Sequence, residues 1–135
     1  MRAKGGCYCG AVRYEISGEP TMKLLCYCRE CQHVSGGGPV TVMGVPTESF
    51  TYTQGEPSRF TRTDIPAPVT REFCPNCGTH LTSRVPSLPS VLVKVGGLDD
   101  PSLFGMPQMA IYAGEKQVFH AIPEGVPTLQ GRPGR

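Results

Sequence analysis

The chain has 135 residues, of which 39% are hydrophobic and 18% charged, and it carries a net charge of +2. This length suits one domain and excludes two that each bury a generous core. Scattered basic residues, the lack of tryptophan and the lack of any apolar run of membrane-spanning length argue against a nucleic-acid partner and against a membrane.

Nine short stretches look like strands because β-branched or aromatic residues partly alternate with polar ones between Gly, Pro, Asn or Asp. In chain order they are residues 11–16, 23–27, 39–45, 49–53, 58–63, 69–74, 79–85, 90–95 and 109–113. Only residues 29–35 and 99–104 favour a helical turn. The pattern predicts an all-β fold, with one domain over residues 1–122 and residues 123–135 as its extended, Pro- and Gly-rich C-terminal tail.

The N-terminus has two early basic residues but no apolar segment of the kind that a signal peptide needs. We therefore expect a cytoplasmic protein. Seven cysteines in a reducing compartment, and an odd number of them, indicate metal ligands or reactive thiols in preference to a disulfide framework.

The cysteines form three groups, and geometry decides how they combine. The groups are Cys7 and Cys9; Cys26, Cys28 and Cys31; and Cys74 and Cys77. A tetrahedral zinc ion with Zn–S bonds of about 2.3 Å needs sulfurs about 3.8 Å apart. Residues two apart on a straight strand are separated by about 6.6 Å, so the chain must bend at each Cys-x-Cys.

The stretch "CPNCG" (74–78) reads as a turn whose backbone N–H groups face the sulfurs, and glycines flank Cys7 and Cys9. Combining the two pairs gives a four-cysteine zinc site with no open position, whose role is structural and which closes a long loop. The alternatives are that Cys7 and Cys9 are simply buried thiols, or that the three clustered cysteines join one of the pairs.

The stretch "CYCREC" (26–31) supplies three sulfurs and no evident fourth ligand. Three protein ligands with an open position are typical of a catalytic zinc ion. Equally, His33, His80 or His120 would close the site as a structural one. A third interpretation is a redox thiol group in which Arg29 lowers the pKa of a thiolate.

Four stretches, "GGCYCGAVRYEISGEP", "CYCRECQHVSG", "REFCPNCGTHL" and "GGLDDP", resemble in this order the glutathione-dependent formaldehyde-activating enzyme family, also called the Gfa or centromere-protein-V type. The resemblance implies small antiparallel sheets, as in the Mss4-like fold, and two zinc ions. It places the structural zinc on Cys7, Cys9, Cys74 and Cys77 and the catalytic zinc on Cys26, Cys28 and Cys31.

The family's reaction is the condensation of glutathione with formaldehyde to S-hydroxymethylglutathione, the reverse of a carbon–sulfur lyase step. The resemblance therefore implies a zinc-dependent lyase whose partner is a small thiol such as glutathione, in a monomer or a homodimer. Arg29 and Arg71 are the cations nearest the motifs. Family members often have histidine where this chain has Tyr27 and Ala110. The alternative function is a non-catalytic, zinc-stabilised module that binds thiols or proteins.

Overall fold

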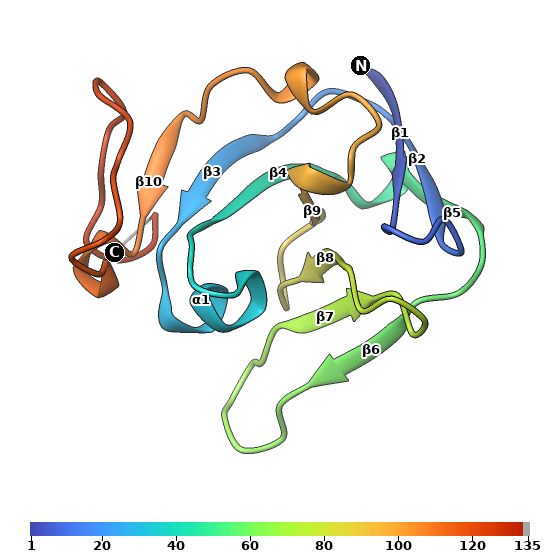
Figure 1. The fold of residues 1–135 in the computed structure, drawn as a ribbon, viewed down its shortest axis with the longest axis horizontal. Helices are drawn as coiled ribbons and strands as arrows, with labels where there is room; N and C mark the ends of the chain where they lie inside the picture. The colour runs from blue at the N-terminus through green and yellow to red at the C-terminus, as the bar shows by residue number, and fades with distance from the viewer. Residues whose placement is uncertain (134–135) are drawn as a thin grey trace.

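The computed structural model describes residues 1–133, which form two β-sheets and one short α-helix (Figure 1). The helix is α1 (Arg29–Ser35). The strands are β1 (Arg2–Gly6), β2 (Arg13–Ser17), β3 (Met22–Cys26), β4 (Val40–Pro46), β5 (Phe50–Gln54), β6 (Ser58–Thr61), β7 (Thr70–Phe73), β8 (His80–Arg84), β9 (Ser90–Lys94) and β10 (Met109–Ile111). Short 3-10 turns lie at Thr47–Ser49, Val95–Gly97, Pro101–Phe104 and Ala113–Glu115.

The smaller sheet has the order β1-β2-β5, and the larger one β10-β3-β4-β9-β8-β7-β6. All neighbours are antiparallel except β10 and β3, which are parallel. The all-β prediction and its nine strands are confirmed, as are the helix at 29–35 and the helical turn after Asp100. No helix in residues 1–133 is long and apolar enough to cross a bilayer.

The sequence did not predict β1, because its glycine pair hides the alternation. Gly5 lies where a Cβ atom would come within 2.4 Å of the Gly97 carbonyl oxygen and of the Tyr14 hydroxyl. The strand therefore depends on contacts with distant parts of the chain, including the bridge between Gly5 and Leu98.

The main core lies between the two sheets. Strands β1, β2 and β5 contribute one side of it and β4, β8 and β9 the other. Its buried members include Tyr14, Ile16, Phe50, Met43, Val45, Leu81, Val91 and Val93. The alternation of β2, in which Tyr14 and Ile16 are buried between exposed neighbours, is what puts one face of the small sheet into this core.

The opposite face of the large sheet is covered by α1. A second apolar cluster joins Cys26 of β3 and Val40 and Val42 of β4 to Val34 of the helix and to Ile111 of β10. Helix α1 ends at Gly36, whose φ of 84° is the left-handed conformation that glycine adopts readily. The helix therefore sits on the sheet face that carries Cys26.

The chain after β10 returns along that strand. The N–H of Leu129 donates to the Ala110 carbonyl, and Ala110 donates to the Pro127 carbonyl. Ile122 and Val126 pack against buried Leu25 and Tyr27. The division into residues 1–122 and a tail at 123–135 stays a prediction, and its last two residues, 134–135, lie outside the described part.

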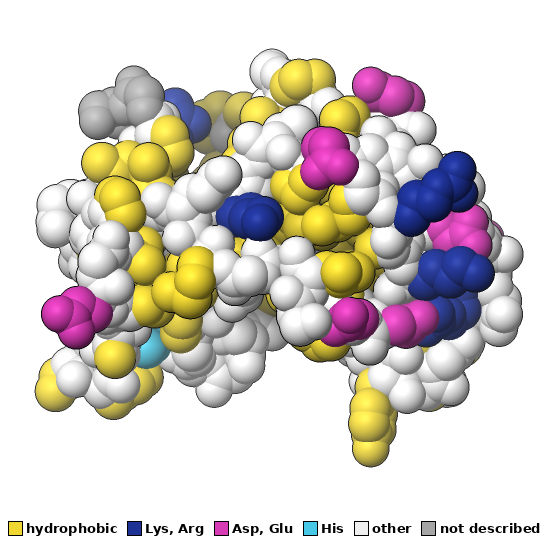
Figure 2. Space-filling model, turned by 90° about the horizontal axis from the view of Figure 1, so that it is seen from above, with side chains coloured by type: hydrophobic (Ala, Val, Ile, Leu, Met, Phe, Trp, Pro, Cys, Tyr) yellow, Lys and Arg dark blue, Asp and Glu magenta, His cyan; other side chains and the backbone are white. Residues whose placement is uncertain are grey.

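Figure 2 shows hydrophobic side chains gathered in the middle of one face and Lys and Arg side chains interspersed with Asp and Glu at one end. Ion pairs on the small sheet agree with this mixture of charges, since Arg13 pairs with Asp99 and Lys4 with Glu15. Charges of one sign do not dominate the face in view.

Candidate metal centres

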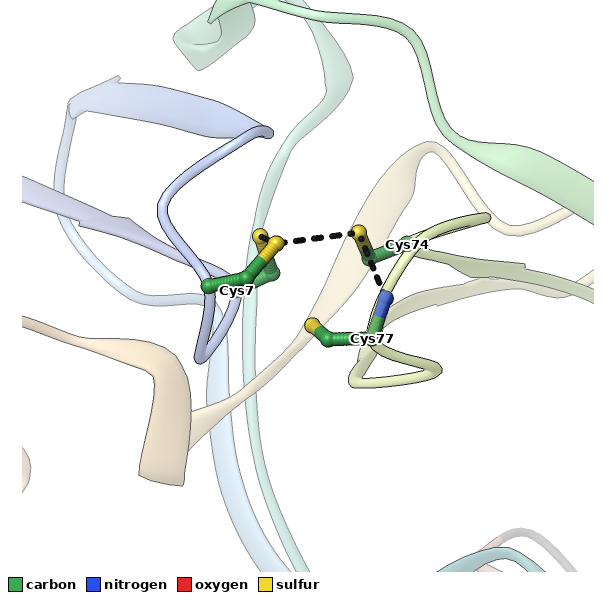
Figure 3. Close-up of side chains that lie close together, drawn as sticks. Cys7, Cys74 and Cys77 are labelled. Carbon is green, nitrogen blue, oxygen red and sulfur yellow. Dashed lines mark hydrogen bonds between the residues drawn. The ribbon is translucent and has the colours of Figure 1, made fainter.

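Four cysteines from two distant turns meet at one end of the core. The sulfurs of Cys7, Cys9, Cys74 and Cys77 all lie within 4.8 Å of one another. Cys7 Sγ is 3.6 Å from Cys9 Sγ, which is 3.8 Å from Cys74 Sγ. Figure 3 shows the side chains of Cys7, Cys74 and Cys77 converging from the turn after β1 and the turn after β7. These separations match the edge of a sulfur tetrahedron around zinc, about 3.8 Å.

Backbone N–H groups surround these sulfurs, as the turn sequence predicted. Val12 donates to Cys7 Sγ at 3.2 Å, and both Asn76 and Cys77 donate to Cys74 Sγ, at 3.3 and 3.4 Å. Hydrogen bonds from Thr79 lower the pKa of Cys77 to about 5. Donors aimed at sulfur stabilise thiolates, which is the form that binds metal.

The other three cysteines gather where β3 meets α1. The sulfurs of Cys26, Cys28 and Cys31 lie within 4.8 Å of one another. Cys26 ends β3, Cys28 is the N-cap residue of α1, and the Cys31 N–H donates to Cys28 Sγ at 3.3 Å. The bend between strand and helix replaces the extended spacing of a Cys-x-Cys strand and brings the sulfurs together.

The three thiols of this cluster compete for ionisation. Hydrogen bonds from Cys26 and Cys31 lower the pKa of Cys28, and hydrogen bonds to Cys28 and Cys31 raise the pKa of Cys26. An ionised sulfur therefore disfavours ionisation of the next one, as expected for like charges in contact. A divalent metal removes this conflict, and three sulfurs are a donor set that zinc accepts.

In residues 1–133, no histidine, aspartate or glutamate places a ligand atom within 4.8 Å of all three sulfurs. His120 is occupied elsewhere, because its ring nitrogens bond the Gln117 N–H and the Gly37 carbonyl. His33 is exposed and contacts Arg29. His80 lines a small cavity next to the cluster, but its ring nitrogens do not belong to the group of ligand atoms that the three sulfurs form.

Two cations lie on the same sheet face as Cys26. Cys26 pairs with Val40 of β4, and Val42, on the same face of β4, pairs with Lys94 of β9. Leu92, on the same face of β9 as Lys94, pairs with Ser83 of β8, and Ser83 pairs with Arg71 of β7. Paired residues point to one face of a sheet. The Lys94 Nζ donates to Ser83 Oγ at 2.6 Å. Burial lowers the pKa of Lys94 to about 8, although the three nearby thiols oppose this shift. Arg71, 12% exposed, lies 3.7 Å from Glu30 of α1.

Sequence reasoning named Arg71 but missed Lys94. The sequence signal for Lys94 was a single lysine inside the apolar run "SVLVKV", at a position that shares a face with Leu92. Arg29, the other cation named, turns to a different cavity on the far side of α1, where its guanidinium donates to Gln32 Oε1 at 2.5 Å.

Tyr27, which lies between Cys26 and Cys28 in the chain, and Ala110 of β10 belong to one buried apolar cluster. Both are fully buried, and the Tyr27 hydroxyl donates to the Ala121 carbonyl at 2.6 Å. The C-terminal residues 122 and 126 pack on them. The tyrosine hydroxyl and the small alanine thus anchor the returning chain.

Comparison with known proteins shows which family the chain belongs to. A protein of Halomonas elongata named "Putative glutathione-dependent formaldehyde-activating enzyme" is 27% identical over 108 residues, which span 76% of this chain and 69% of that protein. The crystal structure of a Rhodobacter sphaeroides protein matches the fold with a TM-score of 0.61 and 21% identity, covering 77% of this chain and 96% of the other. The family described as glutathione-dependent formaldehyde-activating enzyme matches residues 2–115, so the chain belongs to that family.

Proposed function

We propose that the protein is a zinc-dependent enzyme that joins a small thiol, such as glutathione, to formaldehyde and catalyses the reverse carbon–sulfur lyase step. The observation that supports this most is the cluster of three sulfurs to which no His, Cys, Asp or Glu of residues 1–133 adds a fourth ligand. The family's name gives the reaction class, and the Halomonas relative carries the same description.

The two cysteine groups fit two zinc ions with different roles. Cys7, Cys9, Cys74 and Cys77 are a complete tetrahedral set and would hold a structural ion. Cys26, Cys28 and Cys31 would hold the working ion and leave one position for substrate. When bound there, zinc supplies a Lewis acid that lowers the pKa of a thiol ligand.

The reaction balances without an oxidant or a reductant. The substrate sulfur gives an electron pair to the formaldehyde carbon, a C–S bond forms, and the C=O π pair moves to oxygen, which then takes a proton. Negative charge therefore passes from sulfur to oxygen during the step. Protein groups that assist this step must offset negative charge beside the three-cysteine cluster and donate a hydrogen bond to the formaldehyde oxygen.

One of the chain's own residues meets the first of these needs. Arg71 places positive charge on the sheet face that carries Cys26, and the Cys28 sulfur interacts favourably with this guanidinium. The apolar side chains of Val34, Val40 and Val42 exclude water from one side of the cluster. Low dielectric surroundings strengthen the attraction of Arg71 for the developing charge.

Exchange NMR with carbon-13 formaldehyde and glutathione tests the proposal. The zinc-loaded protein should speed exchange between free formaldehyde and its thiol adduct above the uncatalysed rate, and Cys28→Ser should abolish the gain. Uncatalysed exchange in the presence of a folded, zinc-loaded protein would contradict an enzymatic role and favour a module that only binds.

A further inference from the structure

We propose that Lys94 and His80 form a subsite for a carboxylate of the thiol substrate, in the cavity beside Cys26, Cys28 and Cys31. This inference rests on the proposed function and names the residues that select the substrate. It predicts an enzyme that prefers thiols carrying a carboxylate to neutral thiols of similar reactivity.

The cavity lies between α1 and the ends of three strands. Its volume is about 260 Å³. Its walls come from Val34 and Ser35 of α1, Val40 and Thr41 of β4, His80 of β8 and Lys94 of β9. Pockets for whole drug-sized ligands span about 300 to 1,000 Å³, so this cavity suits one end of a small peptide-like thiol.

The cavity adjoins the three-cysteine cluster. Val40 is the register partner of Cys26, and Val34 packs in the same apolar cluster as Cys28 and Cys31. A substrate whose sulfur reaches the cluster can therefore place a neighbouring arm in the cavity.

Lys94 is a cation without a carboxylate partner. Among residues 1–133, no Asp or Glu oxygen lies within ion-pairing distance of its ammonium, whose partner is the neutral Ser83 hydroxyl. An ammonium has three donors, and one bond to Ser83 leaves two of them. A substrate carboxylate would accept from these donors and neutralise a charge that is partly buried.

His80 offers a second unsatisfied polar group. Its Nδ1 atom is buried and has no hydrogen-bond partner among the described residues. The ring lies 5.5 Å from that of Phe73, which holds its orientation. Buried polar atoms without partners are uncommon, and this one belongs to a residue that lines the same cavity as Lys94, so a ligand oxygen that reached it would supply the missing partner.

The larger cavity, of about 560 Å³, is a weaker candidate. It is lined by Arg29, His33 and Phe119 on the other face of α1, and its arginine already donates to Gln32. No residue of that cavity belongs to the apolar cluster that surrounds the three cysteines.

Cobalt-substituted full-length protein provides the test, because a thiol that becomes the fourth ligand changes the visible absorption of cobalt. Wild type, Lys94→Met and the control Lys4→Met would be titrated with glutathione, glutathione diethyl ester and 2-mercaptoethanol. Lys4 is a matched control since it is exposed on the small sheet. Wild type should bind glutathione at least tenfold more tightly than its diester.

Loss of one charge-assisted hydrogen bond should raise the Kd of Lys94→Met for glutathione roughly 10- to 100-fold and leave the Kd for the two thiols that lack a carboxylate nearly unchanged. Lys94→Arg should keep the preference. His80→Leu, a second variant in case Lys94→Met does not fold, should weaken glutathione binding several-fold and spare the diester.

The inference is overturned if wild type binds glutathione and its diester equally well, or if Lys94→Met weakens all three thiols alike, which would assign Lys94 to the charge of the metal centre. If no thiol alters the cobalt spectrum, the proposed function itself fails, and the subsite with it.

Discussion

The sulfurs of Cys9 and Cys74 lie 3.8 Å apart although the residues are 65 positions apart in the chain. Cys9 follows β1 of the small sheet and Cys74 follows β7 of the large one. The four-cysteine group therefore joins the two sheets, whereas Cys26, Cys28 and Cys31 join only one strand to the helix that follows it. Losing a ligand should have different consequences at the two sites.

Cys77→Ser should destabilise the protein far more than Cys28→Ser, because only the first opens the link between the sheets. By analogy with a cross-link that closes a loop of this length, the loss is about 4 kcal/mol, or a melting temperature lower by roughly 15 °C. Cys28→Ser should cost less than half of this. Thermal unfolding of the two zinc-loaded variants, followed by circular dichroism, measures the difference.

Equal losses of stability in the two serine variants would show that both metal sites only hold the fold. That outcome would favour the alternative in which the protein is a non-catalytic binding module.

A mild chelator should remove the two metal ions in separate steps. The three-cysteine site has fewer protein ligands, so its ion should leave first, with loss of thiol binding and little change in secondary structure. The second ion should leave only as the protein unfolds, because its ligands hold the sheets together. Zinc release and circular dichroism recorded together check the order, and a single step in which both ions leave on unfolding would refute it.

Glu72 should make stability depend on acid pH. Its carboxylate is fully buried and accepts hydrogen bonds from Thr82, Arg84, Tyr52 and Arg59, at 2.6 to 3.1 Å. Burial alone would raise its pKa, but hydrogen bonds, first from Thr82 and Arg84, outweigh burial and hold the pKa below its ordinary value. The stabilisation is present above the unfolded-state pKa, near 4.3, and is lost as the pH falls through the lower folded-state value.

Glu72→Gln should therefore lower the free energy of unfolding by about 2 to 3 kcal/mol at pH 7, and the difference from wild type should shrink towards pH 3. Glu48→Gln is the control, because Glu48 is exposed in the turn before β5. Urea unfolding at several pH values measures both. A deficit that stays constant with pH would mean that the ionised carboxylate is not the source of the stability.

Tyr27→Phe should reveal what the tyrosine hydroxyl contributes. Removing its bond to the Ala121 carbonyl should cost about 1 kcal/mol and increase hydrogen exchange in the chain after β10, without changing thiol binding. Tyr8→Phe is the matched control, since Tyr8 is 95% exposed between two cysteines. A loss of thiol affinity in Tyr27→Phe would instead place this hydroxyl in the substrate site.

Much of the fold was predictable because local patterns and tertiary structure agree in this chain. Alternation in "RYEIS" and the Asp–Pro signal before residues 101–104 gave the right elements. Strand β1 was not predicted because Gly5 allows close contact with Tyr14 and with Gly97, and Gly97 is distant in sequence. The parallel pairing of β10 with β3 likewise depends on partners that no local pattern identifies.

The candidate site was predictable in its thiols and less so in its surroundings. Spacing and turn residues sorted the seven cysteines into the two groups that the structure brings together. The cations were harder, because Lys94 reaches the cluster through strand pairing across β4 and Arg71 through two further strands. Arg29, although next to Cys28 in sequence, turns away to the other side of α1.

X-ray absorption at the zinc edge, recorded with and without glutathione, would show whether a substrate thiol completes the three-cysteine site. With two zinc ions per chain, the mean sulfur coordination should rise from about 3.5 to about 4 when glutathione is added, with loss of the light-atom ligand. A coordination number that glutathione leaves unchanged, or one zinc ion per chain, would contradict this expectation.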